Sequence, residues 1–432
     1  MQRRTRIALV AATAVAALSL AACSSGGGGT ATDAMTSHGP ISIWYSNNAA
    51  EVEWGKGMVE AWNADHPDEQ ITAQEIPAGK SSEEVITAAI TAGTTPCLVF
   101  NNLPAATGQF QKQGGLVDLS KFDDGTSYIE ARSGAIADQY KSADGGFYQL
   151  PWKSNPVMIF YNKDLFTAAG LDAENPPLST YDEFLASAKQ LVSSGAATYA
   201  INPSPTSEFF QPNFDFIPLY AAQTGGKGIV EDGKATFAND DGYAVADFWS
   251  SIYSDDLAGK EKYEGDAFVD GKAAMAIVGP WAIAYYGEKI ANWGAVPVPT
   301  ENGTPADETY TFSDAKSVGM YSSCENQGTA WDVLKFATSE EQDGQLLDIT
   351  GQMPIRTDLA TTYSDYFAAN PDYEVFGDQA NRTVEDPTDP ESVAMMQALR
   401  DAYTKAIISG DGDARSALDE AAKKIDSLAG QG

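Results

Sequence analysis

The stretch 145–171, GGFYQLPWKSNPVMIFYNKDLFTAAGL, constrains the fold more than any other part of the chain. A Gly-Gly turn begins it, and Pro151 and Pro156 precede the apolar run 157–161. Proline cannot donate a hydrogen bond to a sheet, and it holds the residue before it in an extended conformation. We therefore predict a strand from one α/β unit, a rigid extended crossing, and a second strand that begins another unit.

Strands and helices alternate on both sides of this crossing. Before it, we predict strands at 41–46, 71–76 and 97–100; after it, at 157–162, 198–201, 273–279, 293–299 and 317–323. The segments between them carry apolar residues at helical spacing, apart from a long loop predicted at 202–220, and two helices follow at 393–403 and 413–428. This alternation predicts an α/β fold with parallel, doubly wound sheets. A chain of 432 residues with 43% apolar content is long enough for two or three such domains.

The N-terminus has the pattern of a secretory signal. Three arginines precede an apolar segment at 7–20 that is too short to span a membrane comfortably, and small residues lead to Cys23. We predict a signal peptide at 1–22 and, by resemblance to a bacterial lipobox, lipidation of Cys23; the alternative is a plain secretory signal with an incidental cysteine. The Gly- and Ser-rich residues 23–39 would then form a tether.

Composition excludes several classes of function. The net charge of −33 argues against nucleic acid and against anionic lipid as partners. The two histidines, His38 and His66, lie in the tether and at a helix end, so we expect no His-based triad and no zinc cluster. No phosphate-binding glycine loop occurs, and 60 acidic residues make any carboxylate pair uninformative about catalysis. We therefore expect that the protein is not an enzyme and that it holds no metal and no cofactor. The alternative is an exported glycoside hydrolase.

Three blocks of sequence resemble one known family. They are GFYQLPW…FYNKDLF…AGL, the block FVDGKAAMAIVGPWAI, and the strand at 317–323 followed by a helix. Together with the lipobox they resemble the extracellular carbohydrate-binding lipoproteins of ABC importers, the maltose-binding-protein-like family. The resemblance spans essentially the whole mature chain.

The resemblance implies two α/β lobes joined by hinge strands, a class II periplasmic-binding-protein-like fold with C-terminal helices. The first lobe would comprise 40–150 and 318–358, and the second 151–317 and 359–432. Such a protein, a monomer anchored at the extracellular face of the cytoplasmic membrane, binds a neutral sugar or oligosaccharide by hinge closure and delivers it to ABC permease subunits. The alternatives are a binding protein for a glycerol phosphodiester or polyol, and a carbohydrate-binding surface adhesin.

Ligand sites of α/β sheets lie beyond the C-terminal ends of the strands, which would converge on the cleft between two lobes. A sugar needs hydrogen-bonding side chains for its hydroxyls and a flat aromatic ring for its apolar face. The predicted ligand-binding residues are Trp44, Ser46, Asn47, Asn48, Asn101, Asn102, Trp152, Lys153, Ser154, Gln211, Asn213, Phe214, Asp215 and Trp281. For the asparagines and Gln211 the alternative is turn chemistry, and for the tryptophans it is packing.

The remaining tryptophans and cysteines have structural interpretations. Trp54, Trp62, Trp249 and Trp331 lie on helical stripes and are predicted to be core, and Trp293 is predicted to be structural. Because the chain is exported, Cys97 and Cys324 are candidates for a disulfide. In the family that the chain resembles, the strand at 317–323 lies antiparallel beside the strand that begins at Cys97, which favours the bridge over two free thiols.

Overall fold

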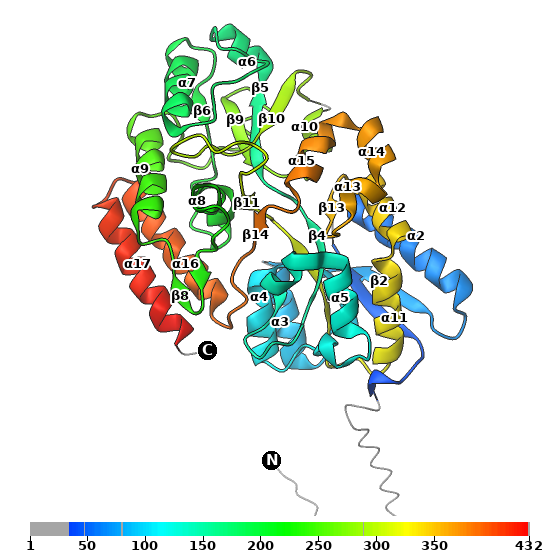
Figure 1. Ribbon diagram of the computed structural model, residues 1–432. Helices are drawn as coiled ribbons and strands as arrows, with labels where there is room; N and C mark the ends of the chain where they lie inside the picture. Colours follow the sequence, from blue (N-terminus) through cyan, green and yellow to red (C-terminus); the bar gives the residue numbers. More distant parts are fainter. Residues whose placement is uncertain (1–33, 47, 79–80, 288, 431–432) are drawn as a thin grey trace, which may run out of the picture.

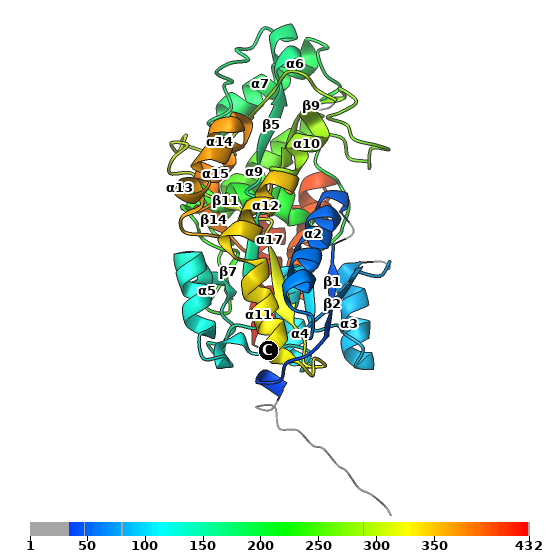
Figure 2. The same ribbon diagram turned by 90° about the vertical axis from the view of Figure 1, so that its right-hand side faces the viewer.

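Two β-sheets organise the structure, a computed structural model that describes residues 34–430 except 47, 79–80 and 288 (Figure 1). One sheet has six strands in the order β13-β4-β12-β3-β1-β2, and the other has four in the order β10-β5-β9-β6. Helices α3, α5 and α11 lie around the six-stranded sheet, and α6, α7 and α10 around the four-stranded sheet at the other end (Figures 1 and 2). The α/β fold with two units is therefore confirmed.

The six-stranded sheet contains the chain before the crossing and two later strands. Its strands are β1 (Ile41–Tyr45), β2 (Ile71–Glu75), β3 (Leu98–Asn102), β4 (Leu150–Ser154), β12 (Lys316–Met320) and β13 (Met353–Pro354). Its helices are α2 (Ala49–Asp65), α3 (Ser82–Ala92), α4 (Pro104–Lys112), α5 (Gly125–Ser133), α11 (Gln327–Ala337) and α12 (Glu340–Thr350), with 3₁₀ turns at η1 (Leu119–Lys121) and η2 (Gly134–Tyr140). β1 is parallel to β2 and β3, as predicted, but β12 is antiparallel to β3 and β4. The sheet is mixed because β12, which enters it from the other unit, and β13 both run opposite to β4.

The four-stranded sheet begins directly after the crossing. Its strands are β5 (Met158–Asn162), β6 (Tyr199–Ile201), β9 (Ala273–Val278) and β10 (Trp293–Val296). The helices of this part are α6 (Lys163–Ala168), α7 (Tyr181–Ser193), α8 (Phe216–Thr224), α9 (Asp240–Ser254), α10 (Trp281–Gly287), α16 (Ser392–Tyr403) and α17 (Ala414–Ala429). Thr180 and Glu183 form a reciprocal capping box at the start of α7, which fixes where this helix begins.

The predicted loop at 202–220 is shorter than expected, because α8 begins at Phe216. Asp215 caps the helix by accepting a hydrogen bond from the Phe216 N–H. The Pro-rich sequence favoured a loop here, but Pro218 lies in the first turn of α8. A backbone N–H at that position has no helical partner, so proline is tolerated.

Three segments run side by side between the two sheets. The Asn155 N–H donates to the Ser313 carbonyl at 2.6 Å, and the Ser313 N–H donates to the Val384 carbonyl at 3.0 Å. The short strands β11 (Thr311–Phe312) and β14 (Thr383–Val384) pair in this region, and a β7 (Val230–Glu231) and β8 (Lys234–Ala235) hairpin lies apart from it. Short helices α13 (Leu359–Thr362), α14 (Ser364–Ala369), η4 (Pro371–Tyr373) and α15 (Glu374–Gln379) precede β14, and a π-helical turn, η5 (Thr404–Ile408), follows α16. We use the name junction for the region where the segments around Asn155, Ser313 and Val384 run side by side.

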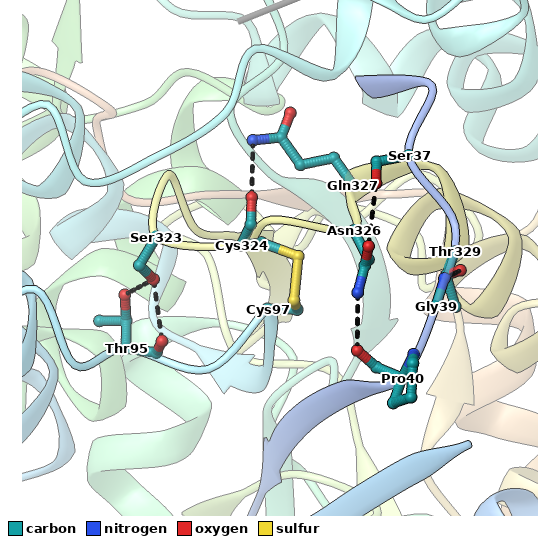
Figure 3. Close-up of a disulfide and its surroundings, with 10 residues drawn as sticks. All are labelled: Ser37, Gly39, Pro40, Thr95, Cys97, Ser323, Cys324, Asn326, Gln327 and Thr329. Carbon is teal, nitrogen blue, oxygen red and sulfur yellow. Dashed lines mark hydrogen bonds between the residues drawn. A yellow bond between two sulfur atoms is a disulfide. The ribbon is translucent and has the colours of Figure 1, made fainter. Parts of the chain in front are cut away.

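The last residues of the predicted tether are packed against α11 (Figure 3). Ser37 Oγ donates to Asn326 Oδ1 at 3.0 Å, and the Gly39 N–H donates to Thr329 Oγ1 at 3.0 Å. The signal peptide at 1–22 and Cys23 lie outside the described residues. Within the described part of the chain, no helix is both long and apolar enough to cross a membrane.

A disulfide joins Cys97 to Cys324, 227 residues apart, with the two Cα atoms separated by 4.5 Å (Figure 3). Cys97 immediately precedes β3, and Cys324 follows β12. Because β3 and β12 are antiparallel neighbours at the centre of the sheet, the start of one strand lies beside the end of the other, and the bridge joins the two strands there.

Candidate ligand-binding site

A hollow of about 360 Å³ lies on the four-stranded side of the junction. Trp281, the first residue of α10, lines it together with Gln211, Phe214 and Tyr286. The Trp281 side chain is 37% exposed, among the few large apolar side chains that the described chain leaves open. Exposed aromatic rings beside an amide give the mixture of apolar face and hydrogen-bonding groups that a sugar requires.

Gly279 lets the Trp281 ring lie against the crossing. A Cβ atom at this position would come within 2.9 Å of the Asn155 carbonyl oxygen and 3.0 Å of Trp281 Nε1. A side chain at residue 279 would therefore push the indole away from the backbone that joins β4 to β5. This contact connects the hollow to the junction.

Buried polar side chains fill the junction on the six-stranded side. Lys153 Nζ, at the end of β4, donates to Glu51 Oε1 at 2.5 Å, and Gln352 Nε2 donates to the same oxygen at 2.9 Å. Asn155 Nδ2 donates in turn to Gln352 Oε1 at 3.2 Å. Burial acts to raise the pKa of Glu51, but the Lys153 charge and the hydrogen bonds from Lys153, Gln352 and Ser46 bring it below its ordinary value.

A second polar group lies where β14 leaves the junction. Asn213 Nδ2 donates to Asp386 Oδ2 at 3.1 Å, and Ser154 Oγ lies 2.8 Å from Ser313 Oγ. Asn213 belongs to the 3₁₀ turn η3 (Gln211–Phe214), whose other members Gln211 and Phe214 line the hollow. One short turn thus reaches both the hollow and the acidic residues of the junction.

Two of the predicted ligand-binding tryptophans are core residues. Trp152 is 1% exposed and its ring lies 5.1 Å from that of Trp54 and 5.2 Å from that of Phe100. Trp44 is buried in a cluster with Ile86 and Val99. Both sit on strands whose side chains alternate between the two faces of the sheet, and helices cover the faces to which these two residues point. We therefore assign both to packing, and not to ligand stacking.

Asp215 also has a structural role. Its carboxylate accepts from Arg400 Nη1 at 2.6 Å and both side chains are fully buried. Burial raises the pKa of Asp215, and Arg400 opposes the rise. This carboxylate caps α8 and neutralises Arg400, so its observed partners are structural, and its part in the ligand site stays a prediction.

The asparagines near the ends of β1 and β3 differ in role, since Asn48 is a helix cap whereas Asn101 and Asn102 end strand β3. Asn48 accepts from the Ala50 and Glu51 N–H groups and caps α2, and Ser46 Oγ accepts from the Asn48 N–H. Asn101 has a left-handed backbone with φ of 71°, and Asn102 is buried beside Tyr321. Asn47 lies outside the described residues.

The predicted core tryptophans Trp54, Trp62, Trp249 and Trp331 are confirmed, since each is at most 4% exposed. Trp293 stacks on Phe160 with ring centroids 5.0 Å apart. Among the described residues, no three His, Cys, Asp or Glu side chains are placed to hold a metal ion.

Sequence reasoning missed five polar residues of the junction: Glu51, Asn155, Gln352, Glu385 and Asp386. Glu51 could have been found, because it lies in the first turn of the helix that follows the first strand. Gln352, Glu385 and Asp386 come from segments far along the chain that carry no motif, and only the crossing of the chain at the junction brings them together.

Comparison with known proteins gives a consistent result. The family model of the bacterial extracellular solute-binding proteins matches residues 47–344. The sn-glycerol-3-phosphate-binding periplasmic protein UgpB of Rhizobium meliloti (strain 1021) is 22% identical over 399 residues, which cover 88% of this chain and 91% of that protein.

Solved structures match almost the whole chain. An uncharacterized protein of Listeria monocytogenes EGD-e has a TM-score of 0.77 at 26% identity and covers 90% of this chain and 100% of its own. The cyclic alpha-maltosyl-1,6-maltose binding protein of Arthrobacter globiformis has a TM-score of 0.77 at 21% identity, covering 91% and 100%. At this identity the second likeness shows the fold alone.

Proposed function

The chain belongs to the family of bacterial extracellular solute-binding proteins, and we propose that it binds a neutral sugar or oligosaccharide in the hollow beside Trp281. It is a solute-binding protein of an ABC importer, and the family and its structural neighbours are binding proteins, not enzymes. The proposal concerns the ligand, its site and the way the protein holds it.

The exposure of Trp281 is the observation that carries the proposal. This indole is 37% exposed, whereas the other helical tryptophans are at most 4% exposed. An exposed ring beside Gln211, Phe214 and Tyr286 in a hollow leaves a large apolar surface open to water, and a pyranose ring would cover it.

The same arrangement supports closure about the junction. We take the lobes to be close to the expected 40–150 with 318–358 and 151–317 with 359–432, with the boundaries moved to the end of β4 at Ser154 and the start of β12 at Lys316, because β1–β4 and β12–β13 share one sheet while β5, β6, β9 and β10 share the other. Three chain segments alone join the two sheets in the described part, so small backbone changes there would move one lobe against the other. A sugar that contacts both lobes stabilises the closed state by its extra contacts in that state.

The lipid anchor belongs to the same proposal. A diacylated Cys23 would hold the body at the extracellular face of the cytoplasmic membrane, where the permease subunits lie. The packed residues 37–39 would tie the tether to the six-stranded lobe, beside α11 and far from α10, the helix that begins with Trp281 (Figure 1).

A phosphorylated ligand is the second candidate, because UgpB of Rhizobium meliloti is named for sn-glycerol 3-phosphate. An anionic ligand would need convergent, available Arg or Lys side chains. In the described junction, Lys153 is paired with Glu51 and Lys316 with Asp314, at 2.5 and 2.7 Å. Lys262 is the exposed lysine at the hollow, and it lies between Glu261 and Glu264 in sequence. These charges favour a neutral ligand.

The test uses the full chain with Cys23→Ser, which removes only the predicted lipid site. Tryptophan fluorescence and melting temperature would be measured against maltose, maltotriose, tagatose, a polyol and sn-glycerol 3-phosphate. We expect a saturable fluorescence change and a rise in melting temperature with one class of neutral sugar, and no product formed. A response to sn-glycerol 3-phosphate alone would replace the sugar by the phosphate ligand, and silence across the neutral panel would contradict the proposal.

A further inference from the structure

Exposed aromatic side chains gather at and beside the hollow. In the part of the chain that the structure describes, four large apolar side chains are exposed: Phe210, Trp281, Tyr285 and Ile349, with exposed fractions of 38%, 37%, 44% and 37%. Phe210 and Trp281 line the hollow, and Tyr285 lies one turn after Trp281 on α10. Apolar side chains that are exposed singly need no explanation, whereas a group of them at one concave place marks a binding site.

Helix α10 carries Trp281 and Tyr285 on the same side. Residues four apart are neighbours on a helix surface, with about 5–6 Å between their Cβ atoms. Ala282, Ile283 and Tyr286 are buried and pack the helix against its lobe, whereas the Trp281 and Tyr285 rings lie on the side that is open to water. The two rings therefore form a row that begins in the hollow and continues past it along α10.

The Tyr285 ring keeps an open surface although it has a neighbour. Lys289 Nζ lies 3.1 Å from the ring centre in a cation–π contact and donates to the Tyr285 carbonyl at 3.4 Å. With this lysine in place the Tyr285 side chain is still 44% exposed. An ammonium group has three N–H donors, so Lys289 can also serve the hydroxyls of a ligand that covers the ring.

The hollow itself suits a short part of a neutral ligand. Phe210 and Phe214, at the two ends of η3, add rings from a second element to its lining. The charged side chains of the lining are Lys262 and Asp266, one of each sign. A volume of about 360 Å³ is near the lower end for small-molecule sites, so a longer ligand would extend out of the hollow.

We propose that the ligand is an oligosaccharide of at least two sugar units, with one unit in the hollow against Trp281 and Phe210 and the next stacked on Tyr285. The inference rests on the proposed function and adds to it the length of the ligand and the residue that recognises it. A monosaccharide would fill the hollow and leave the Tyr285 ring in water. A longer sugar would cover both rings with the apolar faces of successive units, so affinity should rise with chain length.

The experiment measures dissociation constants by calorimetry for glucose, maltose and maltotriose, and for cellobiose and cellotriose as a series of the other linkage. It compares the Cys23→Ser chain with the same chain carrying Trp281→Ala or Tyr285→Ala. The matched control is Ile349→Ala, which removes an equally exposed apolar side chain from α12, outside the lining of the hollow. Melting temperatures without ligand show that each variant is folded.

We expect the Cys23→Ser chain to bind the trisaccharide of one series about tenfold more tightly than glucose, because a second unit buries further apolar surface. Ile349→Ala should keep this ratio of affinities. Tyr285→Ala should reduce the ratio to about threefold or less, and Trp281→Ala should weaken the binding of every member of the series.

Two results would overturn the inference and leave the sugar-binding function in place. One is tight binding of glucose or tagatose without any gain for the longer sugars. The other is a Tyr285→Ala variant that keeps the full ratio, or an Ile349→Ala variant that loses as much of it. If the Cys23→Ser chain binds none of these sugars, the proposed function fails and the inference fails with it.

Discussion

Lys153 Nζ lies 2.5 Å from Glu51 Oε1, and the two side chains are 0% and 7% exposed. Lys153 is on β4, the strand that leads to the crossing, and Glu51 is in the first turn of α2. Burial lowers the pKa of Lys153, and the Glu51 charge opposes that shift. The pair therefore fixes the start of the crossing to the sheet that it leaves.

Replacing Lys153 alone should destabilise the protein strongly. In Lys153→Met, Glu51 would remain buried without a cation, and we expect the free energy of unfolding to fall by roughly 3–5 kcal/mol. The measurement is urea denaturation of the Cys23→Ser chain. The double variant K153M/E51Q should recover most of the loss, and equal stability of the single and double variants would contradict the coupling.

Trp281→Ala should weaken sugar binding without harming the fold. The ring is an exposed anchor at the hollow, so we expect a loss of about 2 kcal/mol, or roughly 30-fold in the dissociation constant. Calorimetry measures the change in the dissociation constant, and the melting temperature shows whether the fold is intact. Trp249→Ala is the contrast, because that ring is fully buried and its loss should cost roughly 3–5 kcal/mol of stability. An unchanged dissociation constant in Trp281→Ala would remove Trp281 from the site.

The disulfide should support stability and not ligand affinity. It closes a loop of 227 residues, for which the chain-entropy model gives about 5 kcal/mol as an upper figure. We expect C97S/C324S to unfold at a lower urea concentration than the parent chain. Reductant should lower the urea midpoint of the parent chain and leave that of the variant unchanged. Sugar affinity should stay the same, because neither cysteine lines the hollow beside Trp281. A changed dissociation constant in the folded variant would place the bridge in the closure mechanism.

The buried carboxyl pair predicts the sign of the pH dependence. Because the folded-state pKa values of Glu385 and Asp386 are raised to about 8 and about 7, the folded chain holds protons that the unfolded chain releases near pH 4. Their contribution to stability is fully present below about pH 4, and it is lost progressively as the pH rises from there to the folded-state pKa values of about 7 and about 8.

We therefore expect the ligand-free parent to lose on the order of 1 kcal/mol per pH unit from this pair between pH 6 and pH 8, relative to E385Q/D386N. Urea denaturation at both pH values checks this. Parallel pH profiles for the parent and the double variant would show that these groups do not titrate in that range.

Much of the architecture was readable from local pattern. The prolines at 151 and 156 predicted a crossing, and the structure places β4 and β5 in different sheets. Helical spacing predicted that Trp54 and Trp249 are buried, and the Thr180–Glu183 capping box occurs as predicted. These features depend on residues close together in sequence. Helical spacing, capping and the backbone restriction of proline are therefore sufficient to predict them.

The tertiary structure decided which polar residues meet. Trp152 and Trp281 each directly follow a proline, yet Trp152 is enclosed by Trp54 and Phe100 while Trp281 lies open at the hollow. Glu51, Gln352 and Asp386 have no common motif, and they converge because three distant chain segments cross between the sheets. The sequence alone determined most strands and helices and the family resemblance, because local patterns encode them, but the predicted parallel pairing was wrong for β5, which is antiparallel to both β9 and β10. The enclosure of a ring and the pairing of a buried charge depend on long-range packing, which no local pattern contains.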